Sequence, residues 1–163
     1  MIVVADTSPL VVLAKIGLIG VLPKLFGKVI VPSAVFEELL SPRRPESVRG
    51  FFATRPAWVE IRTPNTLLVI PNLHLGEAAA LALALELHAD LVLVDDRVAY
   101  RVAVERGLAA VGTIRVLERA AEAGMVDLAS AFEAVKQTNF WLPGGFLDAR
   151  LKLFQQQQLR GGA

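Results

Sequence analysis

Apolar residues along the chain form segments that alternate between strand-like and helix-like periods almost throughout. Short continuous apolar runs are typical of strands buried on both faces of a parallel sheet. Longer segments with apolar residues three and four positions apart are typical of helices packed on such a sheet. The pattern predicts strands at 2–5, 29–31, 58–61, 91–94 and 109–111. It predicts helices at 9–18, 34–40, 76–87, 98–106, 113–123 and 128–136.

This alternation predicts an α/β fold, a three-layer α/β/α sandwich with a central parallel sheet and right-handed crossovers. A length of 163 residues fits a single domain over 1–163, because no repeat and no long linker divides the chain. The basic, proline-rich stretch 41–45 and the aperiodic stretch 65–74 interrupt the pattern. In the tail, Gly144, Gly145 and the glutamines 155–158 indicate loose or partner-dependent structure.

Composition adds an expectation of self-association. The chain is 54% hydrophobic and only 20% charged, which predicts either a very apolar core or a surface buried in an oligomer. We expect a homodimer, because the apolar side chains of the first helix and of three phenylalanines beyond it offer more apolar surface than one small core absorbs. These residues are Leu10, Val11, Leu13, Leu18, Phe51, Phe52 and Phe140.

Charge, cysteine content and hydropathy narrow the class of protein. The formal charge is +1, so contact with nucleic acid requires a local basic patch. The absence of cysteine excludes disulfides and thiolate metal sites and fits a cytoplasmic protein. The most apolar helical run, 78–85, is too short to cross a bilayer, and the first residues lack the basic region of a signal peptide. We therefore expect no membrane association.

Acidic residues stand where predicted strands end or helices begin. Asp6 closes the first apolar strand, and Ser8 and Pro9 favour a helix start directly after it. The carboxyl ends of strands are where open α/β sheets place their sites. Three further acidic positions occupy comparable junctions: Glu37–Glu38, Glu77 and Asp95–Asp96.

A group of carboxylates at one sheet edge favours a divalent-metal site. Mg²⁺ and Mn²⁺ prefer carboxylate oxygens, and two carboxylates about 4 Å apart repel by roughly 4 kcal/mol unless an ion or a proton offsets the charge. Such an ion can activate water and stabilise a phosphodiester under in-line attack. The alternative for each acid is structural: Asp6 and Asp96 as helix caps, Glu77 as a first-turn residue favoured by the helix dipole. Periodicity does not choose between Glu37 and Glu38, which flank the buried helix face equally.

The segments around these acids resemble the PIN-domain nucleases, especially short prokaryotic members near the VapC-like toxins. The similarity runs in family order over about 1–125, which would make 126–163 a C-terminal helical extension. It lies in the following segments: Val4-Ala5-Asp6-Thr7-Ser8-Pro9-Leu10, Leu13-Ala14-Lys15, Val31-Pro32-Ser33-Ala34-Val35-Phe36-Glu37-Glu38-Leu39, Leu75-Gly76-Glu77-Ala78-Ala79-Ala80-Leu81-Ala82, Leu93-Val94-Asp95-Asp96-Arg97 and Gly112-Thr113.

The resemblance implies which residues form the catalytic and metal-binding set. The first three acids fall on Asp6, Glu38 and Glu77. Spacing from Glu77 favours Asp95 as the fourth, whereas matching of strand ends favours Asp96, which we prefer slightly. The third acid is a glutamate here, where many toxin members have aspartate. Candidate substrate-binding residues are the hydroxyls Thr7, Ser8 and Thr113, together with the arginines Arg43, Arg44 and Arg49, whose alternative role is a solvated basic loop.

The function implied is a Mg²⁺- or Mn²⁺-dependent endoribonuclease that hydrolyses RNA phosphodiester bonds. One role for it is the toxin of a toxin–antitoxin pair, with a cognate antitoxin protein as partner. The alternative is a non-catalytic PIN-like module that binds nucleic acid or protein, and a third reading is a DNA-directed nuclease.

Overall fold

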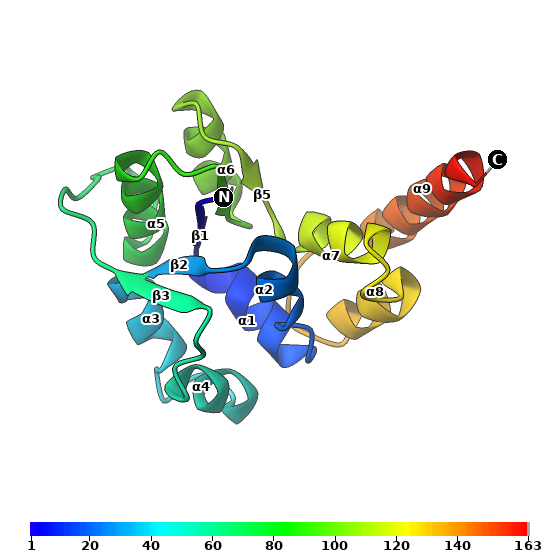
Figure 1. Ribbon diagram of the computed structural model, residues 1–163, viewed down its shortest axis with the longest axis horizontal. Helices are drawn as coiled ribbons and strands as arrows, with labels where there is room; N and C mark the ends of the chain where they lie inside the picture. The colour runs from blue at the N-terminus through cyan, green and yellow to red at the C-terminus, as the bar shows by residue number, and fades with distance from the viewer. Residues whose placement is uncertain (163) are drawn as a thin grey trace.

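Parallel strands form the central sheet in the order β3-β2-β1-β4-β5 (Figure 1). The computed structural model describes residues 1–162. The strands β1 and β4 pair with Val3 opposite Leu91 and Ala5 opposite Leu93, so they end side by side. The strand bounds are β1 Val3–Ala5, β2 Val29–Pro32, β3 Val59–Arg62, β4 Leu91–Leu93 and β5 Ala110–Val111.

Two apolar cores lie on opposite faces of the sheet. Successive strand residues point to opposite faces, so Val3 and Ala5 join one core while Val4 joins the other. The Val4 face is covered by α5 (Leu75–Glu86) and α6 (Arg97–Glu105). The other face is covered by α1 (Thr7–Lys15), α2 (Val21–Phe26), α3 (Ser33–Leu39), α4 (Glu46–Ala53), α7 (Thr113–Glu122) and α8 (Leu128–Lys136). This confirms the predicted three-layer α/β/α sandwich.

The apolar residues expected at a dimer interface lie largely inside the chain. Leu10, Leu13 and Phe52 are completely buried and Val11 is 6% exposed, while Leu18, Phe51 and Phe140 are half-buried against the same core. The prediction that these side chains form an exposed dimer surface is therefore wrong. A sheet covered on both faces absorbs two apolar layers, which accounts for the apolar excess. The homodimer itself stays a prediction.

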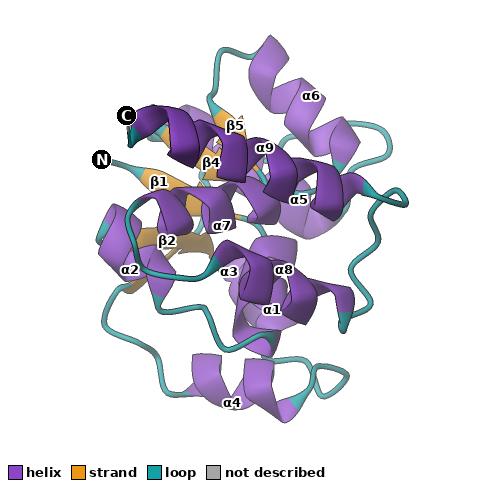
Figure 2. Ribbon diagram, turned by 90° about the vertical axis from the view of Figure 1, so that its right-hand side faces the viewer, coloured by secondary structure: helices purple, strands orange, loops and turns teal. Residues whose placement is uncertain are grey.

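The C-terminal residues form α9 (Phe146–Gly161), which extends away from the sheet (Figure 1). The expectation of loose structure at residues 155–158 is wrong, because they belong to α9, whose Leu147, Leu151 and Phe154 recur at helical spacing and pack against the core. Glutamine also has a favourable helix propensity. Partner dependence of this stretch stays a prediction. In Figure 2, α9 runs above α7, and an ion pair between Arg150 and Glu118 joins these two helices.

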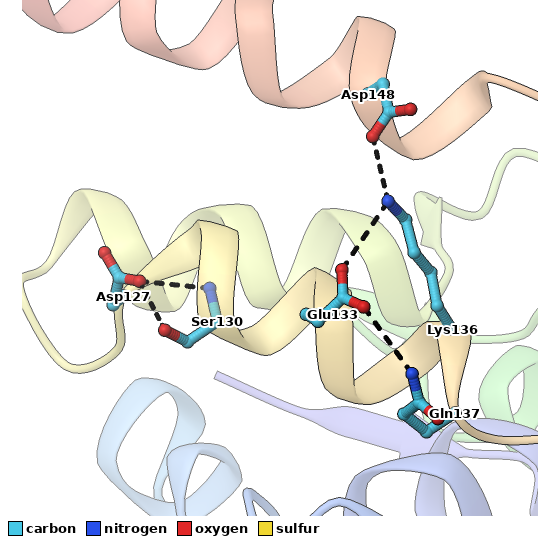
Figure 3. Close-up of polar contacts among 6 residues, drawn as sticks. All are labelled: Asp127, Ser130, Glu133, Lys136, Gln137 and Asp148. Atoms are coloured by element: carbon cyan, nitrogen blue, oxygen red, sulfur yellow. Dashed lines mark hydrogen bonds and ion pairs between the residues drawn. The ribbon is translucent and has the colours of Figure 1, made fainter.

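A salt-bridge group ties α9 to α8 (Figure 3). Lys136 Nζ lies 2.9 Å from Asp148 Oδ1 and 3.7 Å from Glu133 Oε2. These side chains are exposed, so the group fixes orientation more than it adds stability. Within residues 1–162, no helix is both long and apolar enough to span a membrane.

Candidate active site

A cleft of about 650 Å³ opens at the carboxyl edge of the sheet, and three of the predicted acids line it. Asp6 follows β1, Glu38 lies on α3, and Glu77 lies in the first turn of α5. These residues are far apart in sequence, and the parallel topology brings them together. The cleft is the part of the molecule that fits the predicted acidic site.

Asp6 is the most deeply buried of these acids. Its side chain is 4% exposed, and Oδ1 has no hydrogen-bond partner in the described part of the chain. Asp6 occupies the N-cap position of α1, yet its side chain makes no capping hydrogen bond, so the cap interpretation is not supported. Burial raises the pKa of Asp6 to about 7; the Thr7 backbone N–H opposes this, and the charges of Glu77, Glu38 and Asp95 add to it.

Glu38, rather than Glu37, faces the cleft. Glu37 is exposed to solvent, whereas Glu38 is half-buried and lines the cleft. Thr7 Oγ1 donates a hydrogen bond to Glu38 Oε2 at 2.5 Å. A Cβ on Gly76 would lie 2.8 Å from Glu38 Oε1, so the close approach of α5 depends on glycine there. The carboxylate of Glu38 is thus held between α1 and α5.

Glu77 has both a structural and an electrostatic link to the site. Its Oε2 accepts a hydrogen bond from the His74 backbone N–H at 3.1 Å, which supports the start of α5. Burial raises the pKa of Glu77, the negative charges of Asp96 and Glu38 raise it further, and the His74 backbone N–H opposes them. The first-turn role expected for Glu77 is therefore present together with its place in the acidic group.

Asp95 and Asp96 differ in how they are held. Asp95 accepts hydrogen bonds from the Thr113 backbone N–H and from Thr113 Oγ1, both at 2.7 Å, and from Ser8 Oγ at 3.0 Å. Burial raises the pKa of Asp95, and these hydrogen bonds oppose it. Asp96 Oδ1 caps α6 by accepting from the Ala99 backbone N–H at 2.9 Å. Asp95 acts electrostatically on Asp6, and Asp96 on Glu77, so both border the acidic group.

The predicted hydroxyl residues bind carboxylates of this group. Thr7 donates to Glu38, and Ser8 and Thr113 donate to Asp95. All three of these hydroxyls are therefore used in orienting acids. Because each hydroxyl fixes a carboxylate from another segment, these contacts couple the ends of β1 and β4 to α1, α3 and α7.

Of the predicted arginines, only Arg44 is among the residues that line the acidic cleft. Arg44 Nε donates to the Glu38 carbonyl oxygen at 3.4 Å. Arg43 is exposed, and Arg49 forms an ion pair of 2.6 Å with Glu46 on the surface of α4. Three arginines that are close in sequence thus place one cation at the cleft. Arg49 lies outside the cleft lining, because it belongs to α4, which begins after Pro45.

The residues that line this cleft include several that the sequence did not predict as site residues, among them Lys15, His74, Asn139 and Trp141. Lys15 could have been found, because Ser8, Val12 and Lys15 follow helical spacing and line the cleft together. Its Nζ donates to Asn139 Oδ1 at 3.0 Å. Asn139 and Trp141 belong to an irregular segment after α8, where no periodicity indicates which side chains return to the sheet edge.

A family model described as PIN domain (DUF3368) matches residues 2–156. The chain belongs to the PIN-domain family. Among solved structures, this PIN domain is similar to a PilT N-terminus domain protein from the hyperthermophilic archaeon Sulfolobus solfataricus P2. The TM-score is 0.51 and the identity 17%, with 88% of this chain and 100% of that chain covered, so the likeness concerns the fold. Comparison with curated protein sequences finds no match.

PIN domains have a nuclease-type fold and usually bind divalent metals, and the donor set of this PIN domain fits such an ion. Asp6 presents a buried carboxylate oxygen without a partner, next to the charges of Glu38 and Glu77. Within residues 1–162, no three Asp, Glu or His side chains form a ready ligand group for direct coordination. Mg²⁺ usually keeps several waters and binds one or two carboxylates directly, so a partly hydrated ion fits this set.

Proposed function

We propose that this PIN domain is a Mg²⁺- or Mn²⁺-dependent endoribonuclease. The observation that carries the proposal is the Asp6 carboxylate, buried with an unpartnered oxygen in a cleft that Glu38 and Glu77 also line. A buried carboxylate oxygen without a hydrogen-bond partner is costly. Its place at a strand end, beside two more acids and without a capping bond, is better explained by a cation-binding role than by a structural one.

The chain's own residues divide the work as follows. Asp6, Glu38 and Glu77 would hold the ion, while Thr7 fixes the Glu38 carboxylate and Thr113 and Ser8 fix Asp95. The fourth acid would be Asp96, whose Oδ2 is not used in its capping bond. Among the neighbouring acids, Asp96 has the largest effect on the pKa of Glu77. A divalent ion held by these acids would supply activation of water and stabilisation of negative charge on the phosphodiester.

Two cations that line the same cleft would contact RNA beside the acids. Lys15 and Arg44 line the same cleft as Asp6 and Glu38. Phosphate contacts position a nucleic acid without reading its sequence, so these residues would orient the backbone over the acids. Arg43 and Arg49 would add at most a distant, salt-sensitive attraction, because they lie outside the cleft lining.

Cleavage of an end-labelled single-stranded RNA tests the proposal. The parent protein should cleave this RNA in Mg²⁺ or Mn²⁺, and EDTA should abolish the cleavage. Asp6→Asn, nearly isosteric, should keep the fold and lose cleavage. Metal-dependent cutting of single-stranded DNA but not RNA would replace RNA with DNA as the substrate. RNA binding without cutting would favour the non-catalytic module.

The toxin role is a narrower form of the same proposal and rests on the sequence resemblance of residues 1–125. It predicts that expression of the parent protein arrests bacterial growth and that Asp6→Asn does not. It also predicts an antitoxin partner, which co-expression of the neighbouring reading frame would reveal by restoring growth. Normal growth with active parent protein would leave a nuclease without a toxin role.

A further inference from the structure

A second cleft, of about 660 Å³, meets the acidic cleft at residues 140–141. Phe140 and Trp141 line both clefts. Asp95 and Asp96 line the second cleft, which continues past them to Arg97 and Arg115. The two clefts therefore form neighbouring parts of one surface, with the acids near their junction.

Trp141 stands at this junction with its indole exposed. It is 75% exposed, whereas the neighbouring Phe140 is half-buried against the core. The other tryptophan, Trp58, is half-buried, with its ring centroid 6.3 Å from that of Phe51. Trp141 thus contributes little to the core, and truncating it should leave the fold intact.

The backbone around Trp141 is held in place rather than free. Asn139 accepts a hydrogen bond from Lys15 Nζ at 3.0 Å. The Phe140 backbone N–H donates to Thr138 Oγ1 at 3.2 Å, and that hydroxyl donates to the Val135 carbonyl oxygen at 2.7 Å. These contacts tie the residues just before Trp141 to α1 and α8, so the backbone that carries the indole is anchored beside the acids.

Positive side chains lie on both sides of the indole. Lys15 and Arg44 line the acidic cleft, and Arg97 lines the second cleft. Arg97 is exposed and has no ion-pair partner among residues 1–162, whereas Arg115 is paired with Glu122 at 2.9 Å. Proteins that bind single strands combine such cations along a groove with an aromatic side chain on which a base stacks.

We propose that Trp141 is a stacking platform for one unpaired base of a single-stranded RNA that crosses from the acidic cleft into the second cleft. Arg97 contacts the phosphate backbone of that strand beyond the platform. The proposal rests on the proposed function, since it takes RNA as the substrate, and it adds a preference for unpaired bases. Bases in a duplex are already stacked on each other, so their faces are closed to the indole.

Tryptophan fluorescence gives a readout that is independent of cleavage. The chain has two tryptophans, so Trp58→Phe leaves Trp141 as the single emitter. The probe is a ten-nucleotide single-stranded RNA, titrated in EDTA and again in an Asp6→Asn background with Mg²⁺. Saturable quenching of the emission by the single strand, and no quenching by the same sequence as a duplex, is the expected result.

Affinity measurements identify the residues responsible. Trp141→Ala should weaken single-strand binding by about 5- to 100-fold, and Trp141→Phe, which keeps a ring, should weaken it less. Trp58→Phe should leave the affinity unchanged. The logarithm of the affinity falls as the logarithm of the salt concentration rises, and Arg97→Ala should make this negative slope shallower by about 0.7. Arg101→Ala, on the same helix but paired with Glu105, is the matched control and should keep the parent slope.

The outcomes separate this inference from the proposed function. If Trp141→Ala binds the single strand as tightly as the parent, or if bound RNA leaves the Trp141 emission unchanged, the platform is wrong while the nuclease stands. If the RNA quenches Trp141 but the parent with Mg²⁺ or Mn²⁺ does not cut it, the nuclease is wrong while the platform stands. If the parent binds no RNA under either condition, both fail.

Discussion

Gly112 leaves no room for a side chain beside the carboxylate of Asp95. A Cβ on Gly112 would stand 2.7 Å from Asp95 Oδ1 and 3.3 Å from the Val94 carbonyl oxygen. Asp95 cannot swing away freely, because Thr113 and Ser8 hold both of its oxygens. The residue before α7 is therefore glycine, because a side chain there would clash with Asp95, which follows the neighbouring strand β4.

Gly112→Ala should displace the Asp95 carboxylate and weaken its bonds to Thr113. We expect a loss of about 1–3 kcal/mol in the free energy of unfolding, typical of forcing an atom into a packed site. Nuclease activity should fall as well. Gly20→Ala is the matched control, because nothing lies within 4 Å of a Cβ there. Urea unfolding of both variants checks this, and equal stability would show that Asp95 is not confined by Gly112.

The stability of the metal-free protein should decrease as pH rises. The pKa of Asp6 is about 7 in the folded chain, whereas its ordinary value of 3.8 applies to the unfolded chain. The folded state therefore holds the proton more tightly than the unfolded state does. The free energy of unfolding therefore falls between about pH 4 and pH 7, by on the order of 4 kcal/mol from this carboxyl alone. Glu77 and Asp95 shift in the same direction.

Urea unfolding in EDTA at pH 5 and pH 8 measures this dependence. The parent should be more stable at pH 5, and Asp6→Asn should lose much of the difference because its side chain does not ionise. A parent protein equally stable at both pH values would contradict the raised pKa of Asp6.

A divalent ion should stabilise the fold, since it offsets the repulsion among the acids. At a free concentration one hundred times its Kd, one ion adds about 2.7 kcal/mol, or roughly 5–11 °C in Tm for a domain of this size. Thermal melts in EDTA and in excess Mn²⁺ provide the comparison. Asp6→Asn should show a smaller shift than the parent, whereas superimposable melts of the parent would argue against a metal site.

We still expect a homodimer, although not through the first helix. Large apolar side chains that stay exposed include Leu153 and Leu159 on α9, and Leu67 and Val69 in the segment before α5. A symmetric pair burying on the order of 1,600 Å² would cover such groups. Light scattering at micromolar concentration should give twice the 17.6 kDa of one chain, and a mass near 17.6 kDa would rule the dimer out at that concentration.

Strand ends were the part of the site that sequence could predict. Asp6 and the pair Asp95–Asp96 follow apolar runs typical of buried parallel strands, and parallel strands bring their carboxyl ends to one edge. The choice of Glu38 over Glu37 could not be made from the helical wheel. It depends on α1 and α5, which supply Thr7 and the space at Gly76.

Side chains from irregular segments were beyond sequence reasoning. Trp141 has no periodic neighbours, and only the contacts between Lys15 and Asn139 and around Thr138 show where its segment returns to the sheet. The prediction of the dimer surface is wrong for another reason. Counting apolar residues does not reveal that helices on both sheet faces bury them, as they bury Leu13 and Phe52.

The most direct test of the central claim compares two adjacent glutamates on one short helix. Glu38→Gln and Glu37→Gln make the same chemical change, one facing the acidic cleft and the other facing solvent. In an RNA cleavage assay with Mn²⁺, we predict a loss of at least about 100-fold for Glu38→Gln and parent-like activity for Glu37→Gln. Equal rates for the two variants would contradict the assignment of this cleft as a metal-dependent nuclease site.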